Sequence, residues 1–266
     1  MKILSSISMI ALGVTLVGCG SGGGGGGSGG SSASNPPSQV PTKTEPQLPT
    51  TPPTSQVESE WKAKIREAKL IRIDHETLRL SDDVAFPSQI FNMADEKLGK
   101  LEQELGRNWV LKAYNLPYSA VGYVLPADVS TDEYGRVIDS RANNYMAEVV
   151  GARTEILPKG SAYYEGVSFG ANSEGKLKLS INFSDKTISG SVTDRKLLST
   201  KEALADISLK EANISAVGEH HFSGVAESQG IQGSYYGSFF GPNAEEVGGI
   251  IRDDAGNKYE GFSGTK

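Results

Sequence analysis

The chain has 266 residues, of which 37% are hydrophobic and 22% are charged, and its formal net charge is −6. This balance excludes a chain that is disordered throughout, and the acidic excess disfavours a nucleic-acid partner. No run of twenty hydrophobic residues occurs, so we expect no transmembrane helix. The single cysteine, Cys19, excludes an intramolecular disulfide and any structural zinc site built on two or more cysteines.

Residues 1–18 are predicted to be an export signal. Lys2 supplies its basic start and Ile7–Val17 its short apolar stretch, which is too short to span a bilayer. The segment Leu16-Val17-Gly18-Cys19 resembles the signal of bacterial lipoproteins. That resemblance implies cleavage before Cys19, acylation of Cys19 and, because no Asp follows it, sorting to the outer membrane. The alternative is an ordinary signal peptide with a chance cysteine.

Residues 19–59 are predicted to be the lipidated cysteine and a disordered tether. The tether is almost pure Gly and Ser up to Ser34, and it is rich in Pro, Thr and Gln between Asn35 and Ser59. Neither composition can bury a core. About 40 residues of flexible chain reach roughly 35 Å, so we expect the folded part to stand off the membrane.

Residues 60–158 are predicted to form a small α+β handle domain. Apolar residues at helical spacing predict an amphipathic helix over Val57–Leu70, and alternation predicts a hairpin from Leu70–Ile73 and Leu78–Leu80. A second helix is expected over Phe91–Leu105, with Gly106 as its C-cap. Its apolar residues recur at steps of three and four. Strands are expected at Trp109–Tyr114, Ser119–Leu125 and Tyr145–Ile156.

Residues 159–266 are predicted to form an antiparallel β-barrel. Eight short alternating segments follow one another at about ten-residue spacing, with expected turns at Glu174-Gly175, Ser184-Asp185 and Gly256-Asn257. Eight strands that close on themselves leave no edges, and side chains fill their interior. An open sandwich is the alternative. The expected strands are Tyr163–Phe169, Lys176–Phe183, Thr187–Thr193, Ile207–Ile214, His220–Glu227, Gly233–Phe240, Glu246–Arg252 and Asn257–Gly264.

Three segments carry a resemblance to a known family. Residues 237–249 resemble the strand–turn–strand of the transferrin-binding protein B barrel domain, which is shared with factor H binding protein and other surface lipoproteins exported by the Slam translocon. Residues 151–166 resemble the entry into the first barrel strand. Residues 114–119 resemble a handle segment of smaller members, including the haem-binding haemophilins. The signature residues, read as structural, are Gly237, Phe239, Gly241, Pro242, Asn243, Ala244, Glu245, Glu246, Gly248 and Gly249.

The resemblance implies a mainly β, surface-exposed outer-membrane lipoprotein. It also implies a host protein as ligand, for nutrient-iron acquisition or immune evasion, and a Slam-type translocon as export partner. One alternative is a haemophilin-like haem-binding protein, and another is a structural or accessory lipoprotein of the periplasm. We expect no cofactor if the ligand is a host protein. Haem would be the cofactor of a haemophilin-like protein.

Residues that could carry chemistry are few. The chain has three histidines, His75, His220 and His221, which are the candidate haem ligands. His220 and His221 are neighbours in an expected strand, so their rings face opposite sides and cannot chelate one metal there. For the same reason Glu245 and Glu246 are a poor acid–base pair, and we expect them to cap backbone N–H groups.

Motifs of catalysis are absent from the sequence. It contains no Gly-x-Ser-x-Gly, no His-Glu-x-x-His and no phosphate loop, and lipidation would consume Cys19. We therefore expect no enzyme, no catalytic residues and no metal site.

Overall fold

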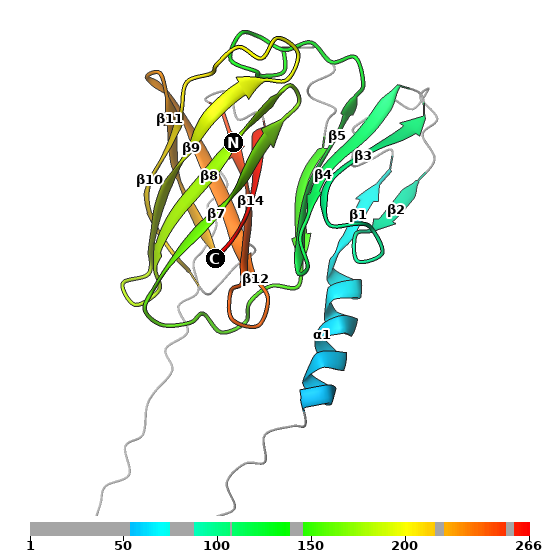
Figure 1. Ribbon diagram of the computed structural model, residues 1–266, viewed down its shortest axis with the longest axis vertical. Helices are drawn as coiled ribbons and strands as arrows, with labels where there is room; N and C mark the ends of the chain where they lie inside the picture. Colours follow the sequence, from blue (N-terminus) through cyan, green and yellow to red (C-terminus); the bar gives the residue numbers. More distant parts are fainter. Residues whose placement is uncertain (1–53, 75–87, 107, 139–145, 216–220, 254–257) are drawn as a thin grey trace, which may run out of the picture. The chain divides into compact units, whose positions relative to one another are not determined.

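The computed structural model describes residues 54–74, 88–106, 108–138, 146–215, 221–253 and 258–266 (Figure 1). Residues Thr51–Lys266 form one compact unit. The expected export signal, Cys19, the tether up to residue 53, the strand Leu78–Leu80, and the turn Gly256-Asn257 lie outside the described residues. No helix in the described ranges is long and apolar enough to cross a membrane.

The unit begins with a helix and a two-stranded sheet. Helix α1 covers Thr54–Ala68, β1 covers Leu70–Ile73 and β2 covers Gln89–Asn92. The helix therefore takes in the last residues of the expected tether, because Thr54 and Ser55 follow two prolines in a sequence that favours a helix start. β1 pairs with β2 in antiparallel register. Its partner is therefore Gln89–Asn92, further along the chain than the expected Leu78–Leu80.

The prediction of a helix over Phe91–Leu105 is wrong. Residues 89–92 form β2, and β3 covers Gly99–Gly106. Leu101 and Leu105 are both buried on one face of β3, because a step of four residues returns to the same side of a strand as well as of a helix. Gly99 has φ +89°, a left-handed conformation that starts the strand rather than continuing a helix.

The next four strands form one antiparallel sheet, which we call the handle sheet. It comprises β3, β4 (Trp109–Asn115), β5 (Ser119–Pro126) and β6 (Met146–Gly151), in that order. One face packs on β1 and β2 around buried residues that include Ile71, Met93 and Leu111. The handle is therefore mostly β, with α1 as its one helix among the described residues.

The last eight strands close into an antiparallel barrel, as predicted, and the open sandwich is excluded. Strand β14 pairs with β7 to complete the ring. Gly175 lies inside β8 beside a register shift, so the turn expected at Glu174-Gly175 is wrong, and the chain turns at Ala171-Asn172 instead. The strands are β7 Ser161–Gly170, β8 Ser173–Asn182, β9 Thr187–Leu197, β10 Ile207–Asn213, β11 Phe222–Ser228, β12 Ile231–Phe240, β13 Glu246–Arg252 and β14 Lys258–Thr265.

Side chains fill the barrel interior. Phe239 lies at its centre, with ring centroids 5.2 Å from Phe183 and 5.3 Å from Phe222. Tyr164 and Tyr235 are fully buried, and burial raises the pKa of Tyr235 to about 12. Packing of this kind makes the interior a core rather than a ligand cavity.

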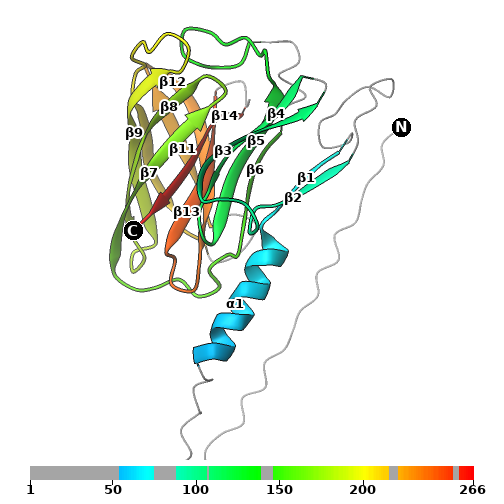
Figure 2. The ribbon, with the colours of Figure 1, turned by 45° about the vertical axis from the view of Figure 1, so that its right-hand side comes forward.

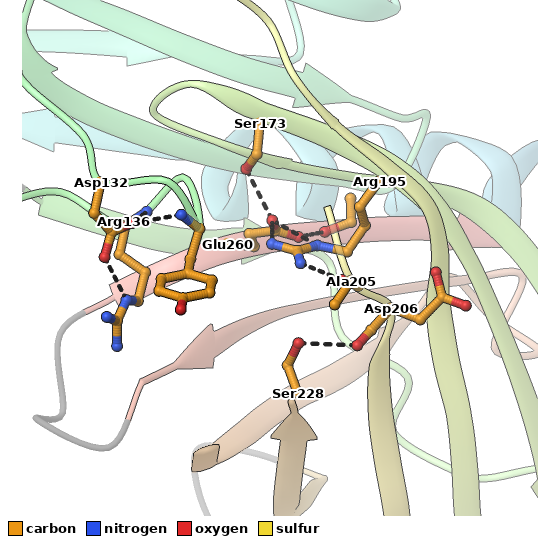
Figure 3. Close-up of polar contacts among 10 residues, drawn as sticks. Asp132, Arg136, Ser173, Arg195, Ala205, Asp206, Ser228 and Glu260 are labelled. Atoms are coloured by element: carbon orange, nitrogen blue, oxygen red, sulfur yellow. Dashed lines mark hydrogen bonds and ion pairs between the residues drawn. The ribbon is translucent and has the colours of Figure 1, made fainter. Parts of the chain in front are cut away.

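A buried ion pair ties four barrel strands together near one end (Figure 3). Arg195 on β9 contacts Glu260 on β14 at 2.6 Å, and the two side chains are 2% and 0% exposed. Glu260 also accepts hydrogen bonds from Ser173 Oγ at 2.8 Å and from Ser168 Oγ. The ion pair and these hydrogen bonds together offset part of the free-energy cost of burying the two charges.

The other face of the handle sheet packs on the barrel wall. β5 and β6 lie against β13 and β14, where Val121 and Tyr123 join Ile250 in one buried cluster. Gly261 has Val121 and Tyr123 directly above it, so a side chain there would push the handle sheet away. Figure 2 shows the handle strands beside the barrel strands.

Candidate binding surfaces and the handle–barrel junction

The three segments that carry the family resemblance meet at one junction between handle and barrel. Thr154 N donates to Phe239 O at 2.9 Å, and Gly241 N donates to Ala152 O at 3.0 Å. Ala152 N in turn donates to Tyr118 O at 2.9 Å. The chain leaving the handle is thus bonded on one side to the handle turn and on the other to the signature turn of the barrel.

A buried carboxylate completes this junction. Glu246 is 2% exposed and accepts hydrogen bonds from Tyr118 N at 2.9 Å and from Ser119 Oγ at 2.7 Å. Burial raises its pKa, an effect that these hydrogen bonds and nearby Lys69 oppose. Lys69 is 1% exposed, donates to Leu116 O at 2.5 Å, and has its pKa lowered to about 8 by burial. The signature glutamate therefore binds barrel to handle.

The neighbouring Glu245 closes the signature turn itself. Its carboxylate accepts hydrogen bonds from Asn243 N at 2.9 Å and from Asn243 Nδ2 at 3.0 Å. Ala244 sits at φ +57°, and its carbonyl accepts from the buried Tyr164 hydroxyl at 2.5 Å. Both signature carboxylates thus accept hydrogen bonds from backbone N–H groups.

Two signature glycines allow close packing on opposite sides of the barrel wall. A Cβ built on Gly237 would meet the Phe222 ring at 2.6 Å and the carbonyl oxygen of Gly248 closer still. A Cβ built on Gly248 would meet methyl groups of Val121 and Val149, both at 3.1 Å. The first glycine serves the barrel core, and the second lets the handle sheet approach.

Of the candidate haem ligands, His221 alone lies among the described residues, since His75 and His220 are outside them. His221 is 9% exposed and its ring lies 5.8 Å from that of Phe239. Its Nδ1 accepts a hydrogen bond from Phe239 N at 3.0 Å. Nδ1 is therefore engaged in holding the first strand of the signature. In the described part of the chain, no group of three or more His, Cys, Asp or Glu side chains is placed to hold a metal ion.

A groove of about 250 Å³ runs along the seam between the handle strands β3 and β4 and the barrel strands β7–β9; we call it the seam groove. Its floor includes Tyr114 and Phe169, whose ring centroids lie 6.5 Å apart. Its rim carries the exposed ion pairs Lys176–Asp194 at 2.8 Å and Lys196–Glu174 at 3.0 Å. Its volume is below the roughly 300–1,000 Å³ usual for small-molecule pockets.

One protein family matches most of the barrel. Residues 155–251, about a third of the chain, match the family described as "Factor H binding protein, C-terminal". The matched range runs from the entry into β7 through β13, and so includes the signature turn. The eight-stranded barrel is therefore similar to the C-terminal domain of that family. No curated protein sequence matches it.

Solved structures with a similar arrangement share little sequence with this chain. HpuA from Kingella denitrificans in complex with human haemoglobin is 18% identical, with a TM-score of 0.42, over 65% of this chain and 58% of that one. Isotype 1 transferrin binding protein B from serogroup B Neisseria meningitidis is 17% identical, with a TM-score of 0.44, over 74% of this chain and 43% of that one. A protein described as a surface lipoprotein is 14% identical, with a TM-score of 0.40, over 74% of this chain and 96% of that one. The match thus spans less than two thirds of the first two chains.

Proposed function

We propose that this protein is a non-catalytic lipoprotein of the outer membrane that binds a host protein at the cell surface. The ligand class is a host protein used for nutrient-iron acquisition or immune evasion. The observation that carries the proposal is the match of residues 155–251 to the factor H binding protein family.

The filled barrel interior supports binding on the outside of the molecule. Aromatic side chains occupy the core, and the signature carboxylates are engaged with backbone N–H groups of the junction and turn. A rigid barrel and a handle sheet fixed to it by buried hydrogen bonds form a scaffold. On such scaffolds the exposed loops and grooves select the ligand.

The N-terminal sequence supports an anchored location. Acylation of Cys19 would hold the protein to the outer membrane, since each buried methylene contributes about 0.8 kcal/mol. The tether that follows would give the folded unit room to reach a large partner. Resemblance to surface lipoproteins supports a Slam-type translocon as the route to the cell surface.

Capture from mammalian serum tests the proposal. The full chain, purified in mild detergent and immobilised, is expected to retain one serum protein at near-stoichiometric yield, identified by mass spectrometry. The same chain unfolded by heat and immobilised in the same way is the control. If the folded chain retains no more than the unfolded one, the host-protein reading is wrong and an accessory role in the periplasm takes its place.

A parallel titration with ferric haem tests the alternative ligand. Under the host-protein reading, haem should give no sharp Soret band at one equivalent per chain. A sharp band that His75→Ala, His220→Ala or His221→Ala abolishes would replace the host protein with haem. Because His221 supports β12, its variant requires a check that the thermal unfolding transition is retained.

A further inference from the structure

The handle sheet ends in a strand with one open edge. β6 is last in the order β3-β4-β5-β6, and among the described residues it pairs with β5 alone. Ala152 N donates to Tyr118 O, and Gly151 is the register partner of Ser119. In an antiparallel ladder, the backbone N–H and C=O groups of one residue bond the partner strand, and those of the next residue point away from it. The N–H and C=O groups of Ala147, Val149 and Gly151 therefore point away from β5.

This edge lies in a groove of about 490 Å³, which we call the edge groove. Both faces of the strand line it, since Ala147 and Val149 pack towards the barrel while Glu148 and Val150 lie on the opposite face. A cavity that takes in both faces of one strand opens on the edge of that strand. Its walls are β1, through Leu70 and Arg72, and the barrel, through Tyr236 and Ile250. β6 accordingly contacts both β1 and β13 (Figure 2).

The groove is positively charged. It is lined by Arg72 and Arg153, and neither guanidinium has an ion pair with another described residue. Glu148 is the one carboxylate among the lining residues. On a chain of net charge −6, this surplus of cations marks a site for acidic side chains.

Open strand edges are usually blocked, because they pair readily with other chains. Here the edge opens into the edge groove, between β1 and the barrel. The outward N–H and C=O groups of Ala147 and Val149, which have no hydrogen-bond partner among the described residues, offer the hydrogen bonds of one more strand. The guanidiniums of Arg72 and Arg153 offer pairing for carboxylates that project from that strand.

We infer that an extended acidic segment of a partner protein adds to β6 as a fifth strand of the handle sheet. This inference rests on the proposed function for the nature of the partner. Main-chain hydrogen bonds to Ala147 and Val149 give the affinity, and Arg72 and Arg153 select the charge.

The probe is a fluorescent heptapeptide, Thr-Val-Glu-Val-Glu-Val-Thr, with both ends blocked. Fluorescence anisotropy with the full chain in mild detergent is expected to show saturable binding, together with slower hydrogen exchange at the Val149 amide. The same peptide with Lys in place of Glu, and the Glu peptide N-methylated at alternate residues, should each bind at least tenfold more weakly. Equal binding of all three peptides would overturn the inference.

Variants of β6 separate the backbone edge from the side chains. Val149→Pro removes an outward N–H and no bond to β5, the placement at which a proline is tolerated in an edge strand. It should weaken peptide binding at least tenfold, whereas Val149→Ala, which keeps the N–H, should weaken it less than threefold. Unchanged binding by a Val149→Pro protein with a normal unfolding transition would overturn strand addition.

Charge reversal tests the selection of acidic segments. Arg72→Glu and Arg153→Glu should each weaken binding of the Glu peptide at least fivefold and improve binding of the Lys peptide. Lys178→Glu on the exposed wall of β8 makes the same charge change away from the groove and should leave both affinities unchanged. If all three variants had the same effect, the net charge of the protein would account for the preference. Selection of acidic segments by Arg72 and Arg153 would then be overturned.

Serum capture distinguishes this inference from the proposed function. If a serum protein is retained equally by the unmodified chain and by Val149→Pro, strand addition is overturned and the proposed function stands. If no serum protein is retained while the Glu peptide still binds and protects Val149, the proposed function fails and the edge site stands.

Discussion

Replacing Gly237 with a larger residue should destabilise the barrel, although strand propensity predicts the opposite. Valine is favoured over glycine in strands by up to about 1 kcal/mol, so an unhindered position would gain stability. At Gly237 the added Cβ would lie 2.6 Å and 2.9 Å from two atoms of the Phe222 ring. Carbon atoms prefer about 3.5–4.0 Å, so the ring would have to retreat by about 1 Å.

The second obstacle is backbone and cannot rotate away. The Gly248 carbonyl oxygen belongs to β13, which is hydrogen-bonded to β12. Overpacking of this kind costs about 1–3 kcal/mol, and the fixed carbonyl places Gly237→Ala at about 2–3 kcal/mol. Gly237→Val, with two further methyl groups, should cost more. For a folded unit of this size, 2–3 kcal/mol lowers Tm by about 4–12 °C.

Thermal unfolding of the full chain, followed by far-ultraviolet circular dichroism, measures the effect. Gly248→Ala in the adjacent strand is the matched control, because its Cβ would meet only side-chain atoms, two of them methyl groups at 3.1 Å, which can shift. It should cost less than about 1 kcal/mol. A Gly237→Val protein as stable as the unmodified chain would refute the packing argument, and equal losses at the two glycines would refute the distinction between backbone and side-chain obstacles.

Three further predictions concern charges and the anchor. Glu260→Gln leaves buried Arg195 without its charged partner and should cost about 3 kcal/mol or more in urea unfolding, whereas Asp194→Asn, which breaks an exposed pair, should cost far less. Lys69 has a folded-state pKa of about 8, below its unfolded value of 10.5, so the unfolded chain binds more protons between these values and stability should rise with pH across that window. The free energy of unfolding of Lys69→Met, measured beside that of the unmodified chain, should lack this rise, and parallel pH profiles would contradict the assignment. Cys19→Ala should abolish incorporation of labelled palmitate, and normal labelling would end the lipoprotein reading.

The barrel could be predicted from sequence because its patterning is local. Each strand alternates inward apolar and outward polar residues, as in β8, where Leu177, Leu179 and Ile181 are buried and Lys176 and Lys178 are not. A period of two with turns at regular spacing has few other solutions. Local pattern therefore determines the strands, and closure follows from their number and order.

The handle was harder to predict from sequence, because the spacing of its apolar residues fits both the helical and the strand period. Leu101 and Leu105 satisfy both a helix turn and two steps of a strand, and only pairing with β4 separates the alternatives. That pairing depends on contacts that the segment itself does not encode. The same limit applies to Gly175, which is placed at a bulge within β8 by its pairing with β9.

The junction was partly accessible from sequence. The adjacent carboxylates Glu245 and Glu246 could be assigned to caps, since neighbouring strand residues face opposite sides. The groups that Glu246 accepts from, Tyr118 N and Ser119 Oγ, lie more than a hundred residues earlier in the chain. The edge groove had no sequence signal at all, because it is made by the order of strands in the handle sheet.

Closure of the barrel by β14 also sets when the protein can fold. Register pairs such as Phe169–Gly261 and Glu165–Thr265 join segments about a hundred residues apart, so the ring cannot form until the last strand is present. Before that moment β7 and β13 both present unpaired edges, which makes the incomplete chain prone to aggregation. During synthesis the unfinished barrel therefore needs protection from other chains until β14 arrives.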